Sequence, residues 1–289
     1  MNILILGGSG FVGGHLVDLL LENENKLVIF DLKNTNKKVS FKKVNILNTN
    51  LTEEISRENP DWIINLVAVR ASSGNYQEEF RINSIGCSRV FEAAKNLKIP
   101  LLHFSSTAVY GEFTKTISDE NHPFNPIDSY GLSKLIGEQI GAKIIADANT
   151  PCVIFRPTII YGPNGTDVVT LFVRKAIRGK PLTVFDNGKY KRDFLYVKDL
   201  VNAVNLVLNA KKSGIFNIGT GKETTILEVA NTVKAFIPDT KILNVESAKK
   251  EVDQGAVDIT KAKKELKFEP EFTLERGVKE TIDFYSNNI

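Results

Sequence analysis

The sequence predicts an α/β fold: a doubly wound parallel sheet with a smaller, mainly C-terminal α/β lobe. Short apolar, β-branched segments recur along the first half of the chain, and amphipathic stretches alternate with them. Right-handed crossovers between parallel strands would place these amphipathic helices on both faces of the sheet. After Arg156 the sequence becomes rich in Pro, Gly and Asn, which predicts the smaller, loop-rich lobe.

The apolar segments predict strands that are buried on both faces, because they lack the alternation of a half-exposed strand. These segments are residues 3–6, 27–30, 62–67, 101–105 and 152–155. Helices are expected between them at residues 11–22, 78–97 and 129–148. Later helices are expected near 168–179, 198–210, 226–236 and 273–286, with a further strand at 215–219.

The composition argues against several classes of protein. The 289 residues are 42% hydrophobic and 25% charged, which is typical of a globular protein with a large core. A net charge of +3, from 37 basic and 34 acidic residues, gives little reason to expect a nucleic-acid partner. Residues 2–6 are too short for a signal peptide or a membrane span, so a cytoplasmic protein without membrane contact is expected. Cys87 and Cys152 form no disulfide or metal-ligand pattern, so both are expected to be buried and no metal site is predicted.

A glycine-rich segment, GGSGFVGG at 7–14, follows the first strand and opens the first helix. Gly7 and Gly10 permit a tight turn whose N–H groups can approach a pyrophosphate at the positive end of the helix. Gly13 is expected to let the helix lie close to the sheet. Asp31 ends the second strand where a carboxylate would bind the adenosine ribose, and its charge favours NAD over NADP, although a plain turn residue is the alternative. Nearby positive charges could weaken that preference: Lys33, Lys37 and Lys38.

The glycine segment assigns a role to the larger part of the predicted fold. Residues 1–157 are expected to form a dinucleotide-binding domain, with 191–219 woven back into it. Residues 158–190 and 220–289 are expected to form the substrate-binding lobe.

The segment SYGLSK at 129–134 places Tyr130 and Lys134 one helical turn apart, on one face of a helix. This spacing alone is typical of an ordinary exposed helix surface. Its setting favours chemistry, because FSSTAVYG at 104–111 carries hydroxyl groups to the C-terminal end of a strand, where open α/β sheets bind ligands. A strand-end cap is the simpler interpretation of Ser106.

Taken together, a series of ordered blocks resembles the extended short-chain dehydrogenase/reductases. The blocks are GGSGFVG, Asp31, SSTAVYG, SYGLSK, RPTIIYGP (156–163), RDFLYVKDL (192–200), FNIGTG (216–221) and DITKAKKELKFEP (258–270). Within that group the chain is most similar to the NAD-dependent epimerase/dehydratase family, which acts on nucleotide sugars and includes the UDP-glucose 4-epimerases. The resemblance implies a Rossmann fold, NAD as cofactor, a nucleotide-sugar substrate and a homodimer formed through helices 78–97 and 129–148.

The resemblance also implies roles for individual residues. Tyr130 would be the general acid–base, and Lys134 would hydrogen-bond the nicotinamide ribose. The implied catalytic residues are Tyr130, Lys134, Ser106 and Thr107. The implied substrate contacts are Ser106, Thr107, Tyr130 and Arg192; a surface ion pair with Asp193 is an equal alternative for Arg192. The implied cofactor contacts are Gly7, Gly10, Phe11, Val12, Gly13, Asp31, Asn45, Ile46, Leu66, Val67, Ala68, Asn83, Tyr130 and Lys134.

These roles predict a nucleotide-sugar 4-epimerase, which oxidises the sugar at C4 transiently and returns the hydride to the opposite face. One alternative is an NAD(P)H-dependent reductase of a nucleotide-linked 4-keto-6-deoxy sugar, which would use the same residues. Asp31 favours the epimerase, because tightly held NAD suits a reaction without net redox change. Another alternative is a cofactor-sensing protein, which would not need the set Ser106, Tyr130 and Lys134.

Three departures from the family pattern bear on the substrate and the reaction. Ala108 and Val109 stand where the dehydratases carry an acidic pair, so dehydration is not expected. Ile159 stands where many epimerases have an Asn that touches the sugar nucleotide. Only Lys249 and Lys250 offer charge where relatives carry a late Arg, and Lys lacks the bidentate fork of Arg.

Two smaller patterns predict packing. His103 lies inside an apolar strand and is expected to be a core histidine with satisfied hydrogen bonds. Gly137 and Gly141, four residues apart, predict that helix 129–148 packs closely against a neighbouring helix.

Overall fold

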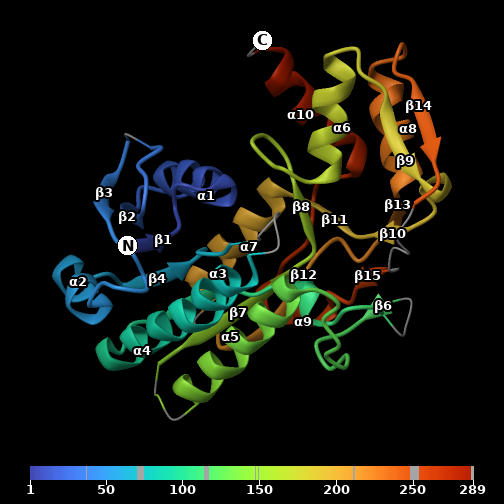
Figure 1. The fold of residues 1–289 in the computed structure, drawn as a ribbon. Helices are drawn as coiled ribbons and strands as arrows, with labels where there is room; N and C mark the ends of the chain where they lie inside the picture. The colour runs from blue at the N-terminus through green and yellow to red at the C-terminus, as the bar shows by residue number, and fades with distance from the viewer. Residues whose placement is uncertain are drawn as a thin grey trace. The chain divides into compact units, whose positions relative to one another are not determined.

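The computed structural model describes residues 1–36, 38–69, 75–113, 117–146, 148, 150–210, 212–247 and 254–287. Its largest sheet has seven strands: β1 (Asn2–Leu6), β2 (Lys26–Asp31), β3 (Ser40–Lys43), β4 (Trp62–Asn65), β5 (Leu101–Phe104), β7 (Cys152–Pro157) and β12 (Gly214–Ile218). Their order is β12-β7-β5-β4-β1-β2-β3, and neighbouring strands from β7 to β3 pair in parallel (Figure 1). From β1 the chain adds β2 and β3 on one side of the sheet, and then returns to add β4, β5, β7 and β12 on the other side. This order confirms the predicted doubly wound sheet.

Helices cover both faces of this sheet. Leu4 and Phe30 belong to a buried cluster that includes residues of α2 (Leu51–Glu58) and α4 (Cys87–Leu97). Ile5 and Ile29 alternate with them along the same strands and are fully buried on the opposite face. On that face α1 (Phe11–Glu22) contacts β2, and a hydrogen bond from Asn23 Nδ2 to Asn205 Oδ1 (3.2 Å) joins the end of α1 to α7 (Val197–Ala210). Burial on both faces explains why the strands are continuously apolar.

The helical part of the chain follows the prediction with one interruption. The expected helix at 78–97 consists of α3 (Tyr76–Phe80), a π-helical segment η1 (Arg81–Gly86) and α4. The expected helix at 129–148 is α5 (Ser129–Ile145). Helix α2 was not predicted, although Asn50 accepts a hydrogen bond from the Glu53 N–H and marks its start. Among the helices that the structure describes, none has the length and apolar character needed to cross a membrane.

The chain divides into two compact units. Unit 1 comprises residues 1–111, 123–156 and 201–216, and unit 2 comprises residues 112–122, 157–200 and 217–289. The sequence placed four stretches with the first domain that belong to unit 2: residues 112–122, 157, 191–200 and 217–219. The assignment of cofactor binding to the first domain and substrate binding to the second stays a prediction.

Unit 2 contains short strand pairs and helices. Its strands are β6 (Ile117–Ser118), β8 (Ile159–Tyr161), β9 (Leu182–Phe185), β10 (Lys191–Arg192), β11 (Phe194–Tyr196), β13 (Thr224–Thr225), β14 (Ile242–Val245) and β15 (Ala256–Val257). Its helices include α6 (Val168–Ile177), α8 (Ile226–Phe236), α9 (Thr260–Leu266) and α10 (Leu274–Ser286), and three of these four were predicted. Helix α8 begins at a reciprocal cap between Thr225 and Glu228, which is a local signal and explains why its boundaries were predictable.

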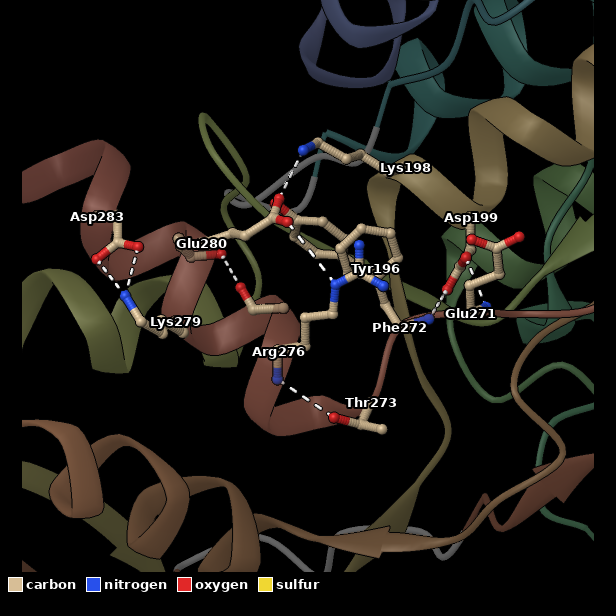
Figure 2. A network of polar contacts seen from close by, with 12 residues as sticks. Tyr196, Lys198, Asp199, Glu271, Phe272, Thr273, Arg276, Lys279, Glu280 and Asp283 are labelled. Atoms are coloured by element: carbon tan, nitrogen blue, oxygen red, sulfur yellow. Dashed lines mark hydrogen bonds and ion pairs between the residues drawn. The ribbon is translucent and has the colours of Figure 1, made fainter.

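A polar network anchors the C-terminal helix within unit 2 (Figure 2). Asp199 is buried and accepts hydrogen bonds from the N–H groups of Glu271 (2.9 Å) and Phe272 (3.1 Å). The Tyr196 hydroxyl donates to Glu280 Oε2 on α10 at 3.0 Å (Figure 2). Residues of the block RDFLYVKDL therefore hold both α10 and the segment before it. Part of this sequence block thus has a structural role.

Candidate active site

A cavity of about 410 Å³ lies at the carboxyl ends of β1, β2 and β4 in unit 1. Its wall includes eight predicted cofactor contacts: Gly7, Gly10, Asp31, Asn45, Ile46, Leu66, Val67 and Ala68. The other lining residues were not predicted: Ser9, Phe30, Leu32, Lys33, Thr35, Val44, Val69 and Ile82. The cavity lies where the order of the strands reverses beside β1, which is the position at which open α/β sheets bind ligands.

The glycine loop fits a phosphate group. Gly7 has φ +78°, and a Cβ there would lie 2.9 Å from the backbone nitrogen of Val67, so only glycine allows this approach. A Cβ on Gly13 would lie 2.5 Å from the Gly8 carbonyl oxygen, so Gly13 packs α1 against the loop itself. Gly10 caps α1 without a side-chain hydrogen bond, and the first turn of α1 carries no acidic residue. The N–H groups at this helix end are therefore suited to the pyrophosphate of a dinucleotide.

Asp31 shapes the loop and also borders the cavity. Its Oδ2 accepts the Ser9 N–H at 3.0 Å, and its Oδ1 accepts the Leu32 N–H at 2.6 Å. An ionised carboxylate has about four acceptor positions, so it retains acceptor capacity for two ribose hydroxyls. The turn and ribose interpretations of Asp31 are therefore compatible.

The lysines near Asp31 have different surroundings. Lys33 lines the cavity, whereas Lys38 forms an exposed ion pair with Asp18 at 3.0 Å. Lys37 lies outside the described residues. Of Lys33 and Lys38, Lys33 is therefore the one placed at the cavity beside Asp31.

Asn45 lies in the wall of the cavity, and its side-chain amide oxygen already accepts a hydrogen bond. Its Oδ1 accepts the Leu47 N–H at 2.9 Å, which leaves the Nδ2 donor for a ligand. An adenine would therefore meet a hydrogen-bond donor at this position. Ile46 beside it is buried and supplies apolar surface.

Asn83 is placed behind the cavity. It is fully buried, its Oδ1 accepts the Val69 N–H at 2.8 Å, and its Nδ2 donates to Val69 O at 2.7 Å. Nδ2 also donates to Ser133 Oγ on α5 at 2.9 Å. The π-helical segment η1 carries Asn83, and such segments are frequent at functional sites. Asn83 would therefore act on a cofactor through Val69, which lines the cavity.

Phe11 and Val12 occupy the first turn of α1 and are half-buried. The Phe11 ring contacts His15 at 5.7 Å between ring centroids. Neither residue belongs to the cavity wall described above, so their predicted support of the pyrophosphate loop stays a prediction.

The first turn of α5 lies against the segment that follows β5. Asp128 accepts the Gly131 N–H at 2.7 Å and starts the helix. A Cβ on Gly131 would lie 2.5 Å from the Ala108 carbonyl oxygen, so the glycine after Tyr130 allows this close contact. The turn that carries Tyr130 is thus packed on the 3₁₀ segment η2 (Thr107–Val109), directly after Ser106.

Lys134 points from α5 to the end of β5. It is 2% exposed, and its Nζ donates to the Phe104 carbonyl oxygen at 2.6 Å. Phe104 is the last residue of β5, so the ammonium is held where the strand leads into Ser105 and Ser106. The predicted helix-surface alternative is therefore wrong for Lys134.

His103 and Cys87 lie in the buried surroundings of Lys134. Burial, followed by the charge of Lys134, holds the pKa of His103 well below its usual value. Its Nδ1 lies 3.1 Å from Asn65 Nδ2, whereas Nε2 has no hydrogen-bond partner within the described part of the chain. Burial raises the pKa of the Cys87 thiol. His103 is thus a core residue as predicted, with one of its two nitrogens satisfied, and Cys87 and Cys152 are both buried as predicted.

Ser106 serves as a cap, which was its simpler interpretation. Its Oγ accepts the Ala108 N–H at 3.1 Å and starts η2. A serine hydroxyl that accepts one hydrogen bond keeps its own hydrogen and a second acceptor position for a ligand. Thr107 beside it is half-buried.

Arg192 belongs to unit 2, where it borders a second cavity of about 420 Å³. The cavity is lined by Ile159, Val168, Leu171, Phe172, Lys175, Thr183, Phe185, Tyr190, Arg192 and Ile226. The neighbouring Asp193 is buried, and both of its carboxylate oxygens accept hydrogen bonds: from Thr220 Oγ1 (2.6 Å), from the Thr220 N–H (2.9 Å to Oδ1 and 3.1 Å to Oδ2) and from the Gly221 N–H (3.0 Å). Because these groups occupy the carboxylate, an ion pair with Arg192 is the weaker alternative.

The comparison with known proteins agrees with this arrangement. The model of the NAD dependent epimerase/dehydratase family matches residues 3–219. The chain belongs to this family. Membership makes it an NAD-dependent enzyme and confirms the resemblance, the fold and the cofactor that the sequence predicted.

Two relatives in the NAD-dependent epimerase/dehydratase family show the range of activities. The chain is 34% identical over 303 residues to "Putative UDP-glucose 4-epimerase" of Methanocaldococcus jannaschii, covering 99% of both chains. It is 32% identical over 299 residues to UDP-glucuronic acid decarboxylase 6 of Arabidopsis thaliana, covering 96% of this chain and 87% of the relative.

Solved structures of family members share the fold over the whole chain. The UDP-glucose 4-epimerase of Thermotoga maritima with UDP-glucose has a TM-score of 0.93 and 29% identity, covering 100% of this chain and 99% of the other. The UDP-glucuronic acid 4-epimerase of Bacillus cereus in complex with NAD has a TM-score of 0.89 and 26% identity, with the same coverage.

Proposed function

We propose that the protein is an NAD-dependent nucleotide-sugar 4-epimerase. One observation carries the proposal: in unit 1, a cavity suited to a dinucleotide lies beside β1, and the first turn of α5 packs on the segment after β5. This packing brings the chain segments of Tyr130 and Ser106 together at the carboxyl edge of the same sheet. Lys134 is held at the end of β5.

The proposed chemistry divides among three side chains. When bound, NAD supplies the hydride acceptor for the sugar C4 carbon. The Tyr130 oxygen takes the proton of the C4 hydroxyl, and the Ser106 hydroxyl orients that oxygen. The buried Lys134 ammonium, held at the end of β5, would hydrogen-bond the nicotinamide ribose. After the keto sugar has turned its other face, C4 would receive the hydride back on that face and Tyr130 would return the proton to the C4 oxygen, so the configuration at C4 is inverted without net redox change.

The nucleotide part of the substrate is assigned to the cavity of unit 2. Phe172, Phe185 and Tyr190 offer aromatic surface for a base, and Lys175 and Arg192 offer positive charge for a diphosphate. Structures of relatives contain UDP-glucose and UDP-glucuronic acid, which favours a uridine diphosphate sugar.

A homodimer through the two predicted helices, residues 78–97 and 129–148, is retained as part of the proposal. Ile85 on η1 and Leu132 and Ile140 on α5 are exposed apolar side chains on these segments. Covering them would favour association of two copies.

Two other reactions need to be distinguished from epimerisation. A reductase of a 4-keto-6-deoxy sugar would use the same residues and consume NAD(P)H. A decarboxylase would release CO₂ from a UDP-glucuronic acid, and 32% identity to such an enzyme gives this alternative a specific basis.

The test is NMR of a panel of UDP-, GDP- and dTDP-hexoses and UDP-glucuronic acid incubated with the protein and substoichiometric NAD. New C4-epimer signals are expected for at least one UDP-sugar. Tyr130→Phe is expected to lower the rate by roughly 10²- to 10⁴-fold, because it removes the acid–base group. Unchanged sugars, with NAD shown to bind, would exclude the epimerase for this panel, whereas CO₂ release or net oxidation of NADH would identify the other reactions.

A further inference from the structure

Arg156 near the end of β7 is 2% exposed although it carries a full charge. Its Nε donates to Glu138 Oε2 at 3.0 Å, and Nη2 donates to Glu138 Oε1. Its Nη1 donates to the Tyr110 hydroxyl at 2.7 Å. Glu138 and Tyr110 are themselves 2% and 0% exposed. One planar guanidinium thus holds two buried partners in different directions.

Two aromatic rings lie close to this guanidinium. The Arg156 Cζ lies 5.1 Å from the centroid of the Tyr110 ring and 4.9 Å from that of Phe124. The two rings are nearly parallel, at an interplanar angle of 9° with their centroids 6.1 Å apart. Because Arg156, Glu138 and Tyr110 are at most 2% exposed, the hydrogen bonds of Arg156 act in a low-dielectric setting and fix their partners firmly.

Glu138 and Tyr110, which accept these hydrogen bonds from Arg156, lie on the two segments that carry the proposed catalytic groups. Glu138 is on α5, one turn beyond Lys134 and two turns beyond Tyr130. Tyr110 ends η2, four residues after Ser106. We propose that Arg156 is a positioning residue, which joins α5 to the segment 106–110 so that Tyr130 and Ser106 meet the same sugar hydroxyl. The inference rests on the proposed function.

A contribution to stability does not by itself explain the buried cluster of Arg156, Glu138 and Tyr110. Replacing a buried ion pair by apolar residues of similar volume is often neutral or stabilising, because the charges lose their hydration on burial. What an apolar replacement cannot supply is the direction of the hydrogen bonds that one rigid group donates to Glu138 and Tyr110. The pair also keeps the Glu138 carboxylate on Arg156, although Lys134 lies four residues away on the same helix.

Two variants separate positioning from stability. Tyr110→Phe removes the hydrogen bond from Nη1 and keeps the ring and the ion pair. The double variant Arg156→Met with Glu138→Leu keeps an apolar core and removes every hydrogen bond of the cluster. Both are expected to fold and bind NAD, and to lower kcat roughly 10- to 100-fold with KM for the sugar nucleotide little changed, because misplacement by about 1 Å has costs of this size. Arg156→Lys is not expected to rescue kcat, because one ammonium cannot hold both partners in the fork geometry.

A variant of the core controls for loss of stability. Ile55 on α2 is fully buried, and Ile55→Ala is expected to lower the melting temperature while leaving kcat unchanged well below that temperature. Amide hydrogen exchange gives a second readout, which does not depend on activity. Both positioning variants are expected to speed exchange in residues 104–110 and 129–138, with the strands β1 and β2 unchanged.

Wild-type kcat in the double variant, or unchanged exchange in both segments, would overturn the inference. If the wild-type protein converts no sugar of the panel, the proposed epimerase fails, and the exchange result then decides the positioning role by itself.

Discussion

His103 is a buried group whose protonation the fold opposes. It is fully buried on β5, and burial, followed by the charge of Lys134, holds its pKa well below the usual value of about 6.5. In the unfolded chain the same imidazole would take up a proton as the pH falls through about 6.5, whereas the folded protein would not. The unfolded state then binds more protons, so this residue lowers the stability of the fold as the pH falls below about 6.5.

We therefore expect His103→Gln to flatten the pH dependence of stability between about pH 6.5 and pH 5. A single group of this kind contributes up to about 1.4 kcal/mol per pH unit. Urea unfolding at several pH values, followed by circular dichroism, measures the slope in the wild type and in the variant. Equal slopes below pH 6.5 would show that His103 takes up its proton in the folded state.

At the scale of elements, close contacts of α5 with its neighbours determine where this helix, which carries Tyr130 and Lys134, lies. A Cβ on Gly137 would lie 2.1 Å from the Asn83 carbonyl oxygen, and one on Gly141 would lie 2.3 Å from the Phe91 ring. The predicted close packing is thus confirmed, and the neighbours are η1 and α4 of the same chain. These glycines are explained within one chain, so they give no independent support to the homodimer.

Gly137→Ala is expected to destabilise the protein by about 1–3 kcal/mol, because the added methyl group meets backbone and α5 must shift. It is also expected to lower kcat, because α5 carries Tyr130 and Lys134. Gly14→Ala in α1 is the matched control, since a Cβ there has nothing within 4 Å. The control is expected to stabilise the protein by about 0.4–1 kcal/mol. Thermal unfolding compares the two variants, and equal stability of both would contradict the packing argument.

At the scale of the whole molecule, NAD is expected to stabilise the fold by mass action. A ligand that binds the folded state alone adds about 2.7 kcal/mol to the free energy of unfolding at 100 times its Kd. NADP is expected to stabilise much less, because its 2′-phosphate would meet the carboxylate of Asp31 at the cavity wall. Melting curves at increasing NAD and NADP test this expectation. Lys38→Ala, which removes an exposed pair with Asp18, is the control and is expected to leave the preference unchanged.

One result would contradict the predicted preference for NAD. If NADP raises the melting temperature of the wild-type protein as much as NAD does, Asp31 does not discriminate, and Lys33 at the same cavity is then the residue to change. An Asp31→Asn variant that loses the preference would support the assignment.

The sequence by itself determined the main elements of the fold, because their signals are local. Apolar runs without alternation identified the strands β1, β2, β4, β5 and β7, and the glycines after β1 identified a turn that excludes side chains. The family also followed from the sequence, since its blocks are short and keep their order. Strand β3 was missed because SFKK is short, polar and at the edge of the sheet.

The partners of buried polar groups were decided by the tertiary structure alone. No local pattern places the Arg156 guanidinium between Glu138 and Tyr110, 18 and 46 residues away, or sets Asn83 against the backbone of Val69. The physical reason is that a buried donor must find an acceptor wherever the folded chain brings one. The periodicity of apolar residues indicates which side of a helix is buried, but it does not indicate which atom from a distant part of the chain lies against that side.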